Sequence, residues 1–442
     1  GFRRGFTTRP RGLPEFYSAV KGAPQCLAAP RTCDVTRGVS ADDKMRLVSF
    51  HLSHPDPDFL YKLTRFVYPA PPGTPWTDIT SPLPGTGPYM ISGYAYRASP
   101  WGKDHSYSFT DLVPNPHFIP WSFAAQPRGY PARIHWMHVP TFLAAVRAVI
   151  AGRADVLLLS DEPNDQGTGE GVRTQYPGQL VTVPQPGTFF DNMNTRAKPF
   201  TDPNVRRAVN YAVDRDALIR VVHRDAVPTC QMLPPNFPSY QWHCPYTREP
   251  HDGRYHGRDL ATARRLVAQS GTRGIVVTVT GSVSDHAENR YIASVLGELG
   301  YRARLHEIPV GQDEYAYVND PRNHVQISTQ IGSWNADYPS AGNFYYTLYA
   351  CSAIQPNSAN NESNAGFCDK NIDRLADTAT ALQASDPGKA RRMWTKVDAR
   401  LTDSAPFIAT YNENNTYFVS SRVHNLQVST WDGPLLDQMW IR

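Results

Sequence analysis

From Ile134 onward, strand-like and helix-like patterns alternate along this 442-residue chain. Residues 134–139 have a strand pattern, a helix pattern starts near Thr141 and is closed by Gly152, and residues 155–159 form a short apolar run. We expect these segments to form a β-α-β unit, in which the two strands pair in parallel through a right-handed crossover. The alternation therefore predicts an α/β fold.

The alternation resumes near residue 200 and continues for most of the chain. Asp202 is suited to cap a helix, and Pro203 suits its first position. Gly271 and Gly300 each follow a helical pattern and are expected to end it. The predicted helices are 202–213, 259–270, 286–299, 372–382 and 387–401. The predicted strands are 275–280, 302–308 and 324–331.

These patterns divide the chain into four parts. Residues 1–128 are rich in proline, tyrosine and short strand-like runs, residues 129–193 and 194–405 are two α/β segments, and residues 406–442 return to short strands. The simplest arrangement has two α/β lobes, with the final segment crossing back to complete the first lobe.

The composition argues against several classes of protein. The net charge of +4 is spread thinly, without the dense lysine and arginine blocks that bind nucleic acid. No run of about 18 apolar residues is present, so we expect no transmembrane segment. Hydrophobic residues make up 40% of the chain, which is enough for a globular protein with a sizeable core.

The six cysteines form three pairs that are close in sequence, and each pair brackets a loop rich in proline, glycine or asparagine. The pairs are Cys26 with Cys33, Cys230 with Cys244, and Cys351 with Cys368. Short loops close at the lowest entropic cost, which favours disulfides within these pairs. Zinc binding, with His243 as a further ligand, is the alternative, but the spacing lacks a Cys-x-x-Cys knuckle. Disulfides would place the protein outside the cytoplasm.

Asp337 is the strongest candidate for a ligand-binding residue. It follows the predicted strand at 324–331, and open α/β sheets commonly bind ligands beyond the carboxyl ends of their strands. Trp334 and Tyr338 flank it, and no lysine, arginine or histidine lies beside it in sequence. A carboxylate between two aromatic rings suits an ammonium group. The alternative is an ordinary turn, because Asp-Tyr-Pro also opens loops.

The common catalytic motifs are missing from the sequence. It contains no Gly-x-Ser-x-Gly elbow, no His-Glu-x-x-His pair and no phosphate-binding Gly-Lys-Ser/Thr loop, so we expect no enzyme, no metal and no cofactor. Asp56 and Asp58 lie among prolines and are expected to be solvated. The spaced glycines Gly167, Gly169 and Gly171 are interpreted as a flexible connector.

Several segments, in the same order, resemble the family 5 extracellular solute-binding proteins, the peptide- and dipeptide-binding components of ABC importers. Pro84 to Tyr89 resembles the "GTGPY" signature, and Gly152 to Val156 matches a "G.aDi" strand entry. Asn194 to Arg215 is similar to the "N…PPF.D..VRQAL.YAID" segment, with Arg207 in place of the usual glutamine. Trp334 to Pro339 is similar to "W.ADYPDP". The resemblance covers nearly the whole chain.

The resemblance implies a two-lobed fold like that of the type II periplasmic binding proteins. Residues 1–128 would be the remainder of a β-rich domain inserted in lobe I. The first strands of lobe I, an export signal and a membrane anchor would then precede Gly1.

The implied function is capture of a peptide or peptide-like solute between two closing lobes, by a monomer that delivers it to a membrane permease. In this family the aspartate of the "ADY" motif is taken to pair with the α-ammonium group of the ligand, and Asp337 matches that position. The other ligand-binding residues would be Trp334, Asn335, Tyr338 and Asn194. Two other functions stay open, a ligand-sensing domain of a larger regulatory protein and an extracellular hydrolase. The ligand itself could be a dipeptide, a longer peptide, a sugar or a metal chelate.

Overall fold

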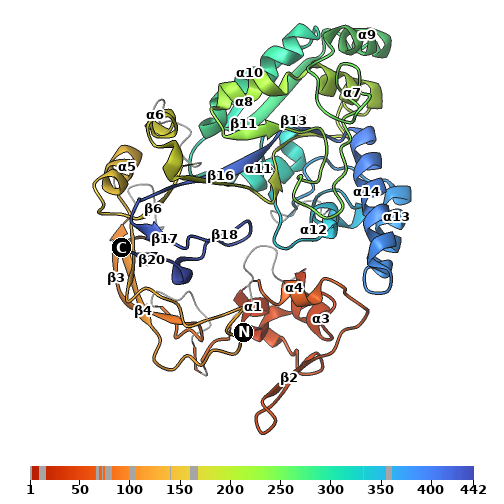
Figure 1. Cartoon of the computed structure of the whole chain (residues 1–442). Helices are drawn as coiled ribbons and strands as arrows, with labels where there is room; N and C mark the ends of the chain where they lie inside the picture. The colour runs from red at the N-terminus through yellow and green to blue at the C-terminus, as the bar shows by residue number, and fades with distance from the viewer. Residues whose placement is uncertain are drawn as a thin grey trace.

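The computed structural model describes residues 2–8, 16–65, 69–71, 73–74, 82–98, 105–139, 141–159, 168–331, 333–354 and 361–442. Helices and strands alternate over most of this length, so the α/β class is confirmed (Figure 1). Among the described helices, none combines the length and the apolar character needed to cross a membrane.

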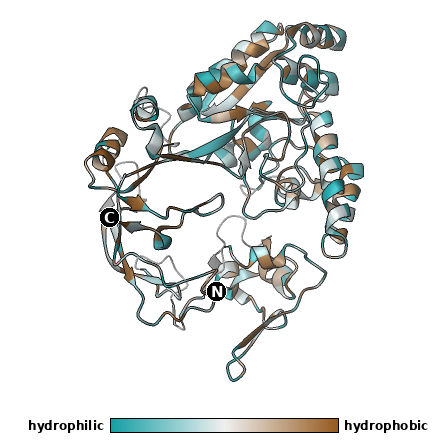
Figure 2. Cartoon of the chain, in the orientation of Figure 1, coloured by the Kyte–Doolittle hydropathy of each residue, from teal (hydrophilic) through white to brown (hydrophobic). Residues whose placement is uncertain are grey.

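A five-stranded mixed sheet is the framework of one part of the molecule. Its strand order is β12-β11-β13-β9-β15; β11 is parallel to β12 and β13, and β9 is antiparallel to β13 and β15. The strands are β12 (Arg302–Ile308), β11 (Val276–Ser282), β13 (Ile327–Ser328), β9 (Phe190–Met193) and β15 (Phe407–Ala409). Three helices share one apolar core with this sheet: α7 (Pro203–Ala212), α9 (Leu260–Ser270) and α10 (His286–Glu298). Brown and teal alternate along α9 and α10 in Figure 2, as expected for helices with one buried side.

The predicted ends of these helices are confirmed. The Asp202 carboxylate accepts a hydrogen bond from the Asn204 backbone N–H, and Asp259 caps α9 in a similar way. Gly271 and Gly300 follow α9 and α10 with φ angles of 66° and 90°. This left-handed conformation favours glycine, which explains why both helices end there.

The predicted strand at 324–331 is much shorter in the structure. Only Ile327 and Ser328 pair with neighbouring strands. Gln330 has a φ of 54°, and this positive angle turns the chain out of the sheet. The apolar residues of the predicted strand, Val325, Ile327 and Ile331, are nevertheless buried.

A second sheet is organised around the long strand β16 (Tyr411–Val419). Three strands pair with β16 in antiparallel orientation: β10 (Ala226–Pro228), β6 (Val156–Leu158) and β7 (Leu180–Pro184). The C-terminal part of the chain therefore closes a sheet whose other strands lie far away in sequence.

The prediction of a parallel β-α-β unit is wrong. β5 (Ile134–Met137), α5 (Phe142–Ile150) and β6 form where expected, but β5 pairs with β4 (His105–Pro114) whereas β6 pairs with β16. β4 also pairs with β3 (Tyr89–Ala98), which completes a three-stranded antiparallel sheet. Each strand thus satisfies its backbone hydrogen bonds with an antiparallel neighbour, and sequence periodicity carries no information on which neighbour that is.

The first part of the chain combines short helices with a hairpin. Its elements are α1 (Phe2–Thr8), α3 (Ala23–Ala28), α4 (Phe59–Lys62), β1 (Val39–Asp42) and β2 (Leu47–Phe50). Phe6, Tyr17, Val20 and Phe59 form its small core, next to the Cys26–Cys33 disulfide.

Two neighbouring segments connect the five-stranded sheet to the sheet around β16. One runs from β7 through β8 (Gly187–Thr188) to β9, and the other runs from β15 to β16. They are hydrogen-bonded to each other: the Phe189 N–H donates to the Tyr411 carbonyl, and the Thr410 N–H donates to the Phe189 carbonyl, both at 3.0 Å. The two sheets are therefore joined by a pair of antiparallel crossing segments.

A second core lies on the other side of the five-stranded sheet. It is formed by α12 (Ala341–Leu348), α13 (Lys370–Leu382) and α14 (Pro387–Ser404), which pack around Phe190 and Phe407.

The Cys230–Cys244 and Cys351–Cys368 disulfides are present, so all three predicted cysteine pairs are confirmed.

The remaining described elements are short. They are α6 (Thr168–Gln175), α8 (Arg215–Val222), α11 (Glu314–Asn319), β14 (Trp334–Asn335), β17 (Val423–His424), β18 (Val428–Ser429), β19 (Gly433–Pro434) and β20 (Trp440–Ile441). Gly169 and Gly171 lie inside α6, so the predicted flexible connector is wrong for these two residues. Gly167 lies outside the described residues.

Candidate functional site

A cavity of about 1290 Å³ lies between the N-terminal part of the chain and the region of α12 and α13. Residues from 16–27 and 54–62 line one side of it, and residues from 334–384 line the other. Three of the predicted ligand-binding residues, Trp334, Asp337 and Tyr338, are among the lining residues. Distant parts of the sequence thus meet around the predicted acid.

Asn343 holds the Asp337 carboxylate in place. The Asn343 side-chain NH₂ donates to Asp337 Oδ2 at 3.1 Å, while Asn343 Oδ1 accepts from the Asp337 backbone N–H at 2.9 Å. The same Oδ1 accepts from the indole N–H of Trp334 at 2.9 Å. Asn343 lies in the first turn of α12, whose N-cap is Ser340. One buried amide therefore fixes both the acid and the neighbouring aromatic ring.

Burial raises the pKa of Asp337 above its ordinary value, and the hydrogen bond from Asn343 and the charge of Arg65 counteract this effect. Arg65 is far from Asp337 in sequence, but its positive charge acts on Asp337 in the folded protein. The Arg65 Nη1 atom lies 3.8 Å from Asp432 Oδ1. Asp337 has no ion pair within 4.0 Å among the described residues. Its carboxylate is therefore available to a cationic group that enters the cavity.

Two aromatic rings of the N-terminal part pack against Tyr338, the residue that follows Asp337. The Tyr338 ring packs edge-on against Phe16, with ring centroids 5.5 Å apart, and stacks on Tyr61 with centroids 6.3 Å apart. Tyr338 is buried, and burial raises the pKa of its hydroxyl. The N-terminal part of the chain therefore supplies two rings that belong to the same aromatic group as Tyr338.

The cavity wall carries more negative than positive charge. Among the described lining residues, the acids besides Asp337 are Asp56, Asp58, Glu362 and Asp377, and the only lysine is Lys62. Lys62 Nζ lies 2.7 Å from Asp56 Oδ2, so this ion pair neutralises one of the acids.

The prediction that Asp56 and Asp58 are solvated is wrong. Asp58 is buried, and its two oxygens accept hydrogen bonds from Ser340 Oγ at 2.8 Å and from Gln383 Nε2 at 2.6 Å. Burial is the main cause of its raised pKa. Proline-rich segments predict a turn, but the packing of this turn against α12 and α13 removes its acids from water.

Two predicted ligand-binding residues do not line the cavity. Asn194 follows β9, where its side-chain NH₂ donates to the Val325 carbonyl at 2.9 Å and its Oδ1 accepts from the Arg196 N–H at 3.0 Å. Asn335 is exposed and lies in β14, which pairs with β8. Asn194 holds a turn at the edge of the sheet, and Asn335 belongs to a strand pair.

The sequence did not predict that Phe16, Tyr61, Asp58 and Asn343 lie in or beside the site around Asp337. The first three lie more than two hundred residues before Asp337, and no local pattern links them to it. Asn343 stands three residues after the N-cap Ser340, which is a signal for a side chain near the start of a helix. Among the described residues, no three metal-ligating groups of the cavity lie close enough to share one ion.

The fold and the cavity define a class of protein: two α/β parts joined by crossing segments, with a cavity lined by distant parts of the chain. The chain belongs to the bacterial extracellular solute-binding proteins of family 5, because the sequence model described as the middle region of that family matches residues 23–356. The predicted resemblance is thus confirmed, and the family has an extracytoplasmic location, in agreement with the three disulfides.

Related sequences include the glutathione-binding protein GsiB of Escherichia coli (strain K12), which is 24% identical over 235 residues. The corresponding protein of Salmonella typhimurium is 25% identical over 235 residues. In both cases the match covers 52% of this chain and 43% of the relative. The matching segment is therefore less than half the length of these relatives.

Solved structures share the fold. The clavulanic acid biosynthesis oligopeptide binding protein 2 superposes with a TM-score of 0.81 at 21% identity, covering 99% of this chain and 78% of that chain. DppA from Helicobacter pylori, in complex with the peptide STSA, has a TM-score of 0.67 at 17% identity and covers 100% of this chain and 81% of that chain. These similarities confirm the two-lobed type II fold.

Proposed function

We propose that this protein captures a peptide or peptide-like solute through the solute's positively charged amino end, which pairs with Asp337. The observation that carries the proposal is the half-buried Asp337 carboxylate in the cavity wall, held by Asn343 and without an ion pair among the described residues. An ammonium group supplies the missing charge and donates hydrogen bonds to the carboxylate. The aromatic rings beside it offer cation–π contacts.

The printed names of similar proteins support a peptide-like ligand. DppA from Helicobacter pylori is described with the peptide STSA, Haemophilus influenzae OppA with the peptide RPPGFSPFR, and GsiB is a glutathione-binding protein. All three of these ligands are peptides or peptide derivatives. The surplus of acids in the cavity wall further favours ligands that carry a net positive charge.

The proposal includes the partner and the cellular setting. A membrane permease of an ABC importer would receive the solute, since structural neighbours include an ABC transporter-associated binding protein. The protein would act as a monomer attached to the membrane outside the cytoplasm, and it would release its ligand unchanged. Light scattering on the purified chain measures its mass, and mass spectrometry of the recovered ligand tests whether it is unchanged.

The central test is the affinity for short peptides, measured by titration calorimetry. Asp337→Ala should weaken peptide binding at least tenfold, which corresponds to about 1.4 kcal/mol, because the ligand ammonium loses its counter-charge. Asp337→Asn should have a similar effect, since the amide keeps the shape of the side chain but not its charge. N-acetylation of the peptide should weaken binding to the wild-type protein by a comparable factor.

An exposed acid on the hairpin of the N-terminal part provides a matched control. Asp43→Asn changes the net charge by the same amount and should leave the affinity unchanged. The assignment of Asp337 fails if Asp337→Asn binds peptides as tightly as the wild-type protein, or if acetylated and free peptides bind equally well.

A further inference from the structure

A loop outside the cavity brings together three side chains that can ligate a metal. His251, Asp252 and His256 each place one ligand atom within 4.8 Å of the others, and all three are exposed. The two imidazole rings lie parallel, with an interplanar angle of 4° and centroids 5.2 Å apart. The sequence gives no local signal for this group, because the spacing of the three residues matches no common metal-binding motif.

Hydrogen bonds determine which nitrogen of His251 carries a proton, and they join His256 to Asp252. His251 Nδ1 lies 2.7 Å from the Glu249 carbonyl, which can only accept, so Nδ1 carries the proton and Nε2 keeps a lone pair in the neutral ring. This type of outer contact commonly orients metal-ligating histidines. His256 Nε2 lies 2.8 Å from Asp252 Oδ1. A metal ion can take the place of the proton between these two atoms.

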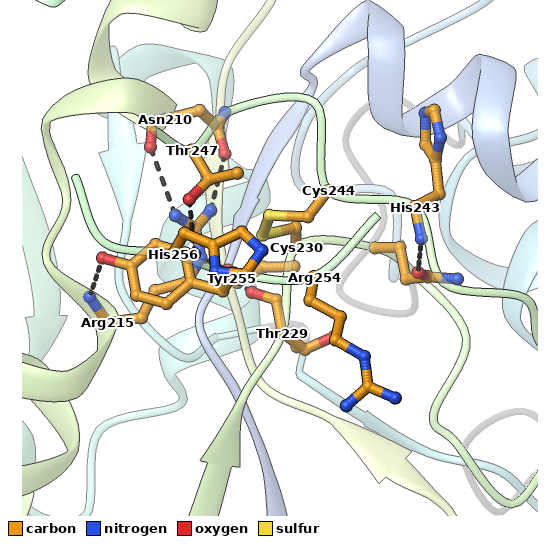
Figure 3. Close-up of a disulfide and its surroundings, with 12 residues drawn as sticks. Asn210, Arg215, Thr229, Cys230, His243, Cys244, Thr247, Arg254, Tyr255 and His256 are labelled. Atoms are coloured by element: carbon orange, nitrogen blue, oxygen red, sulfur yellow. Dashed lines mark hydrogen bonds between the residues drawn. A yellow bond between two sulfur atoms is a disulfide. The ribbon is translucent and has the colours of Figure 1, made fainter. Parts of the chain in front are cut away.

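The loop is anchored at several points, which makes the cluster preorganised. Thr247 is buried, and its Oγ1 accepts from the His256 backbone N–H at 2.7 Å and donates to the Gly257 carbonyl at 2.9 Å. The Tyr255 hydroxyl accepts from the backbone N–H of Arg215 at 3.0 Å. Figure 3 shows Thr247, Tyr255 and His256 grouped beside the Cys230–Cys244 disulfide.

Gly253 makes the tight path of the loop possible. Its φ is +74°, and a Cβ at this position would lie 2.4 Å from the Trp242 carbonyl oxygen. No other residue fits there without a shift of the backbone. The approach to Trp242 fixes the short connection between Asp252 and His256.

Arg254, the arginine between Asp252 and His256, is held away from the cluster. The Arg254 guanidinium lies over the Trp242 ring, 4.5 Å from its centroid, and extends away from the His256 ring in Figure 3. Asp252 Oδ1 also accepts the Arg254 backbone N–H at 2.8 Å, which holds the carboxylate beside His256.

We propose that His251, Asp252 and His256 form a surface site for a divalent transition-metal ion such as Zn²⁺. Two imidazole nitrogens and one carboxylate oxygen are the ligand set that such borderline ions bind, whereas Ca²⁺ and Mg²⁺ prefer oxygen ligands alone. Three ligands from the protein leave at least one coordination position open to water or to a group of another molecule. The site is separate from the peptide cavity, and it does not depend on the proposed peptide-binding function.

Titration calorimetry with Zn²⁺ tests the proposal, using tag-free protein that has been dialysed against a chelator. We expect one Zn²⁺ per chain with micromolar affinity, and no comparable binding of Mg²⁺. His251→Gln and His256→Gln should each weaken Zn²⁺ binding at least tenfold. Co²⁺ should give the visible absorption bands of a bound ion with the wild-type protein but not with His256→Gln.

His117→Gln is the matched control, since His117 is exposed and lies in a different part of the chain. This variant should bind Zn²⁺ like the wild-type protein. Circular dichroism and the thermal midpoint without metal should be the same for all variants, so that a change in affinity reports lost ligands and not an unfolded loop. The proposal is overturned if the wild-type protein shows no saturable Zn²⁺ binding, or if both loop variants bind Zn²⁺ as tightly as the wild-type protein.

Discussion

At the scale of single residues, the chemistry of the site depends on buried polar groups that have partners. Asn343 is the clearest example in the cavity, because one amide accepts two hydrogen bonds and donates a third to Asp337. Burying such a group without its partners costs about 1–3 kcal/mol. The same requirement gives a testable prediction for a buried arginine outside the cavity.

Arg215 is fully buried and joins three parts of the chain. Its Nε donates to the carbonyls of Thr229 and Ala409, both at 2.7 Å, and its Nη2 donates to Asn210 Oδ1 at 3.2 Å (Figure 3). Arg215→Met should lower the free energy of unfolding by about 3 kcal/mol, because these buried acceptors lose their donor. Urea denaturation followed by circular dichroism measures the change.

Arg220 lies on the same helix α8 and is exposed, so Arg220→Met is the matched control. It should change the free energy of unfolding by no more than about 0.5 kcal/mol. A similarly small effect of Arg215→Met would show that the guanidinium does not stabilise the fold through these hydrogen bonds.

At the scale of secondary-structure elements, two buried acids meet where β9, α10 and β16 pack together. Asp191 on β9 and Glu288 on α10 are both buried, and Asp191 Oδ2 and Glu288 Oε1 have no partner in the hydrogen-bond network of the described residues. Burial raises the pKa of both groups, and the neighbouring negative charge raises that of Glu288 further. The surrounding polar and charged groups are Gln330, Tyr411, Asp285 and Arg215.

The raised pKa values predict how stability depends on pH. The folded protein holds a proton on this pair at pH values where the unfolded chain has released it, so the pair stabilises the fold fully below about pH 4. That stabilisation is lost as the pH rises through the raised pKa of the folded pair, at up to about 1.4 kcal/mol per pH unit. Glu288→Gln keeps a polar side chain but removes the titrating carboxyl of Glu288. The free energy of unfolding of this variant should therefore fall less between pH 5 and pH 8 than that of the wild-type protein.

Urea denaturation at a series of pH values compares the two slopes. Glu298→Gln on the same helix is the control, because Glu298 forms a more exposed ion pair with Arg258 and should leave the slope of the wild-type protein unchanged. If the stability of Glu288→Gln and that of the wild-type protein depend on pH with the same slope, the folded protein does not hold an extra proton on Asp191 and Glu288.

Helix positions were predictable at this scale, whereas strand pairing was not. The caps Asp202 and Asp259 and the terminating Gly271 act through contacts with residues close by in the chain, so local sequence contains the whole signal. The partner of β6 is β16, and their contact depends on residues at the other end of the sequence. Periodicity identifies a strand but not its neighbour, which is why the parallel unit at 134–159 was predicted wrongly.

At the scale of the whole molecule, the crossing segments between the two sheets are the natural place for a hinge. They are two neighbouring segments, hydrogen-bonded to each other, that run between the five-stranded sheet and the sheet around β16. A ligand that touches both sides of the cavity stabilises a closed arrangement over an open one. The division of the chain into four parts, which was expected from the sequence, stays a prediction.

Small-angle X-ray scattering measures the closure directly. Saturating a purified sample with a bound peptide should lower the radius of gyration, because closing the lobes brings mass toward the centre. Asp337→Ala at the same peptide concentration should keep the larger value of the free protein. A radius of gyration that does not change when the wild-type protein is saturated would contradict ligand-driven closure.

The amino-acid sequence by itself determined the α/β class, the three disulfides and most helix limits, since each of these depends on neighbouring residues or on a family signature. Only the tertiary structure decided which strands pair, that Asp58 is buried, and that Phe16 lines the same cavity as Asp337. The physical reason is the range of the interactions: capping and loop closure act between residues near in sequence, whereas burial and strand pairing depend on what the rest of the chain brings alongside.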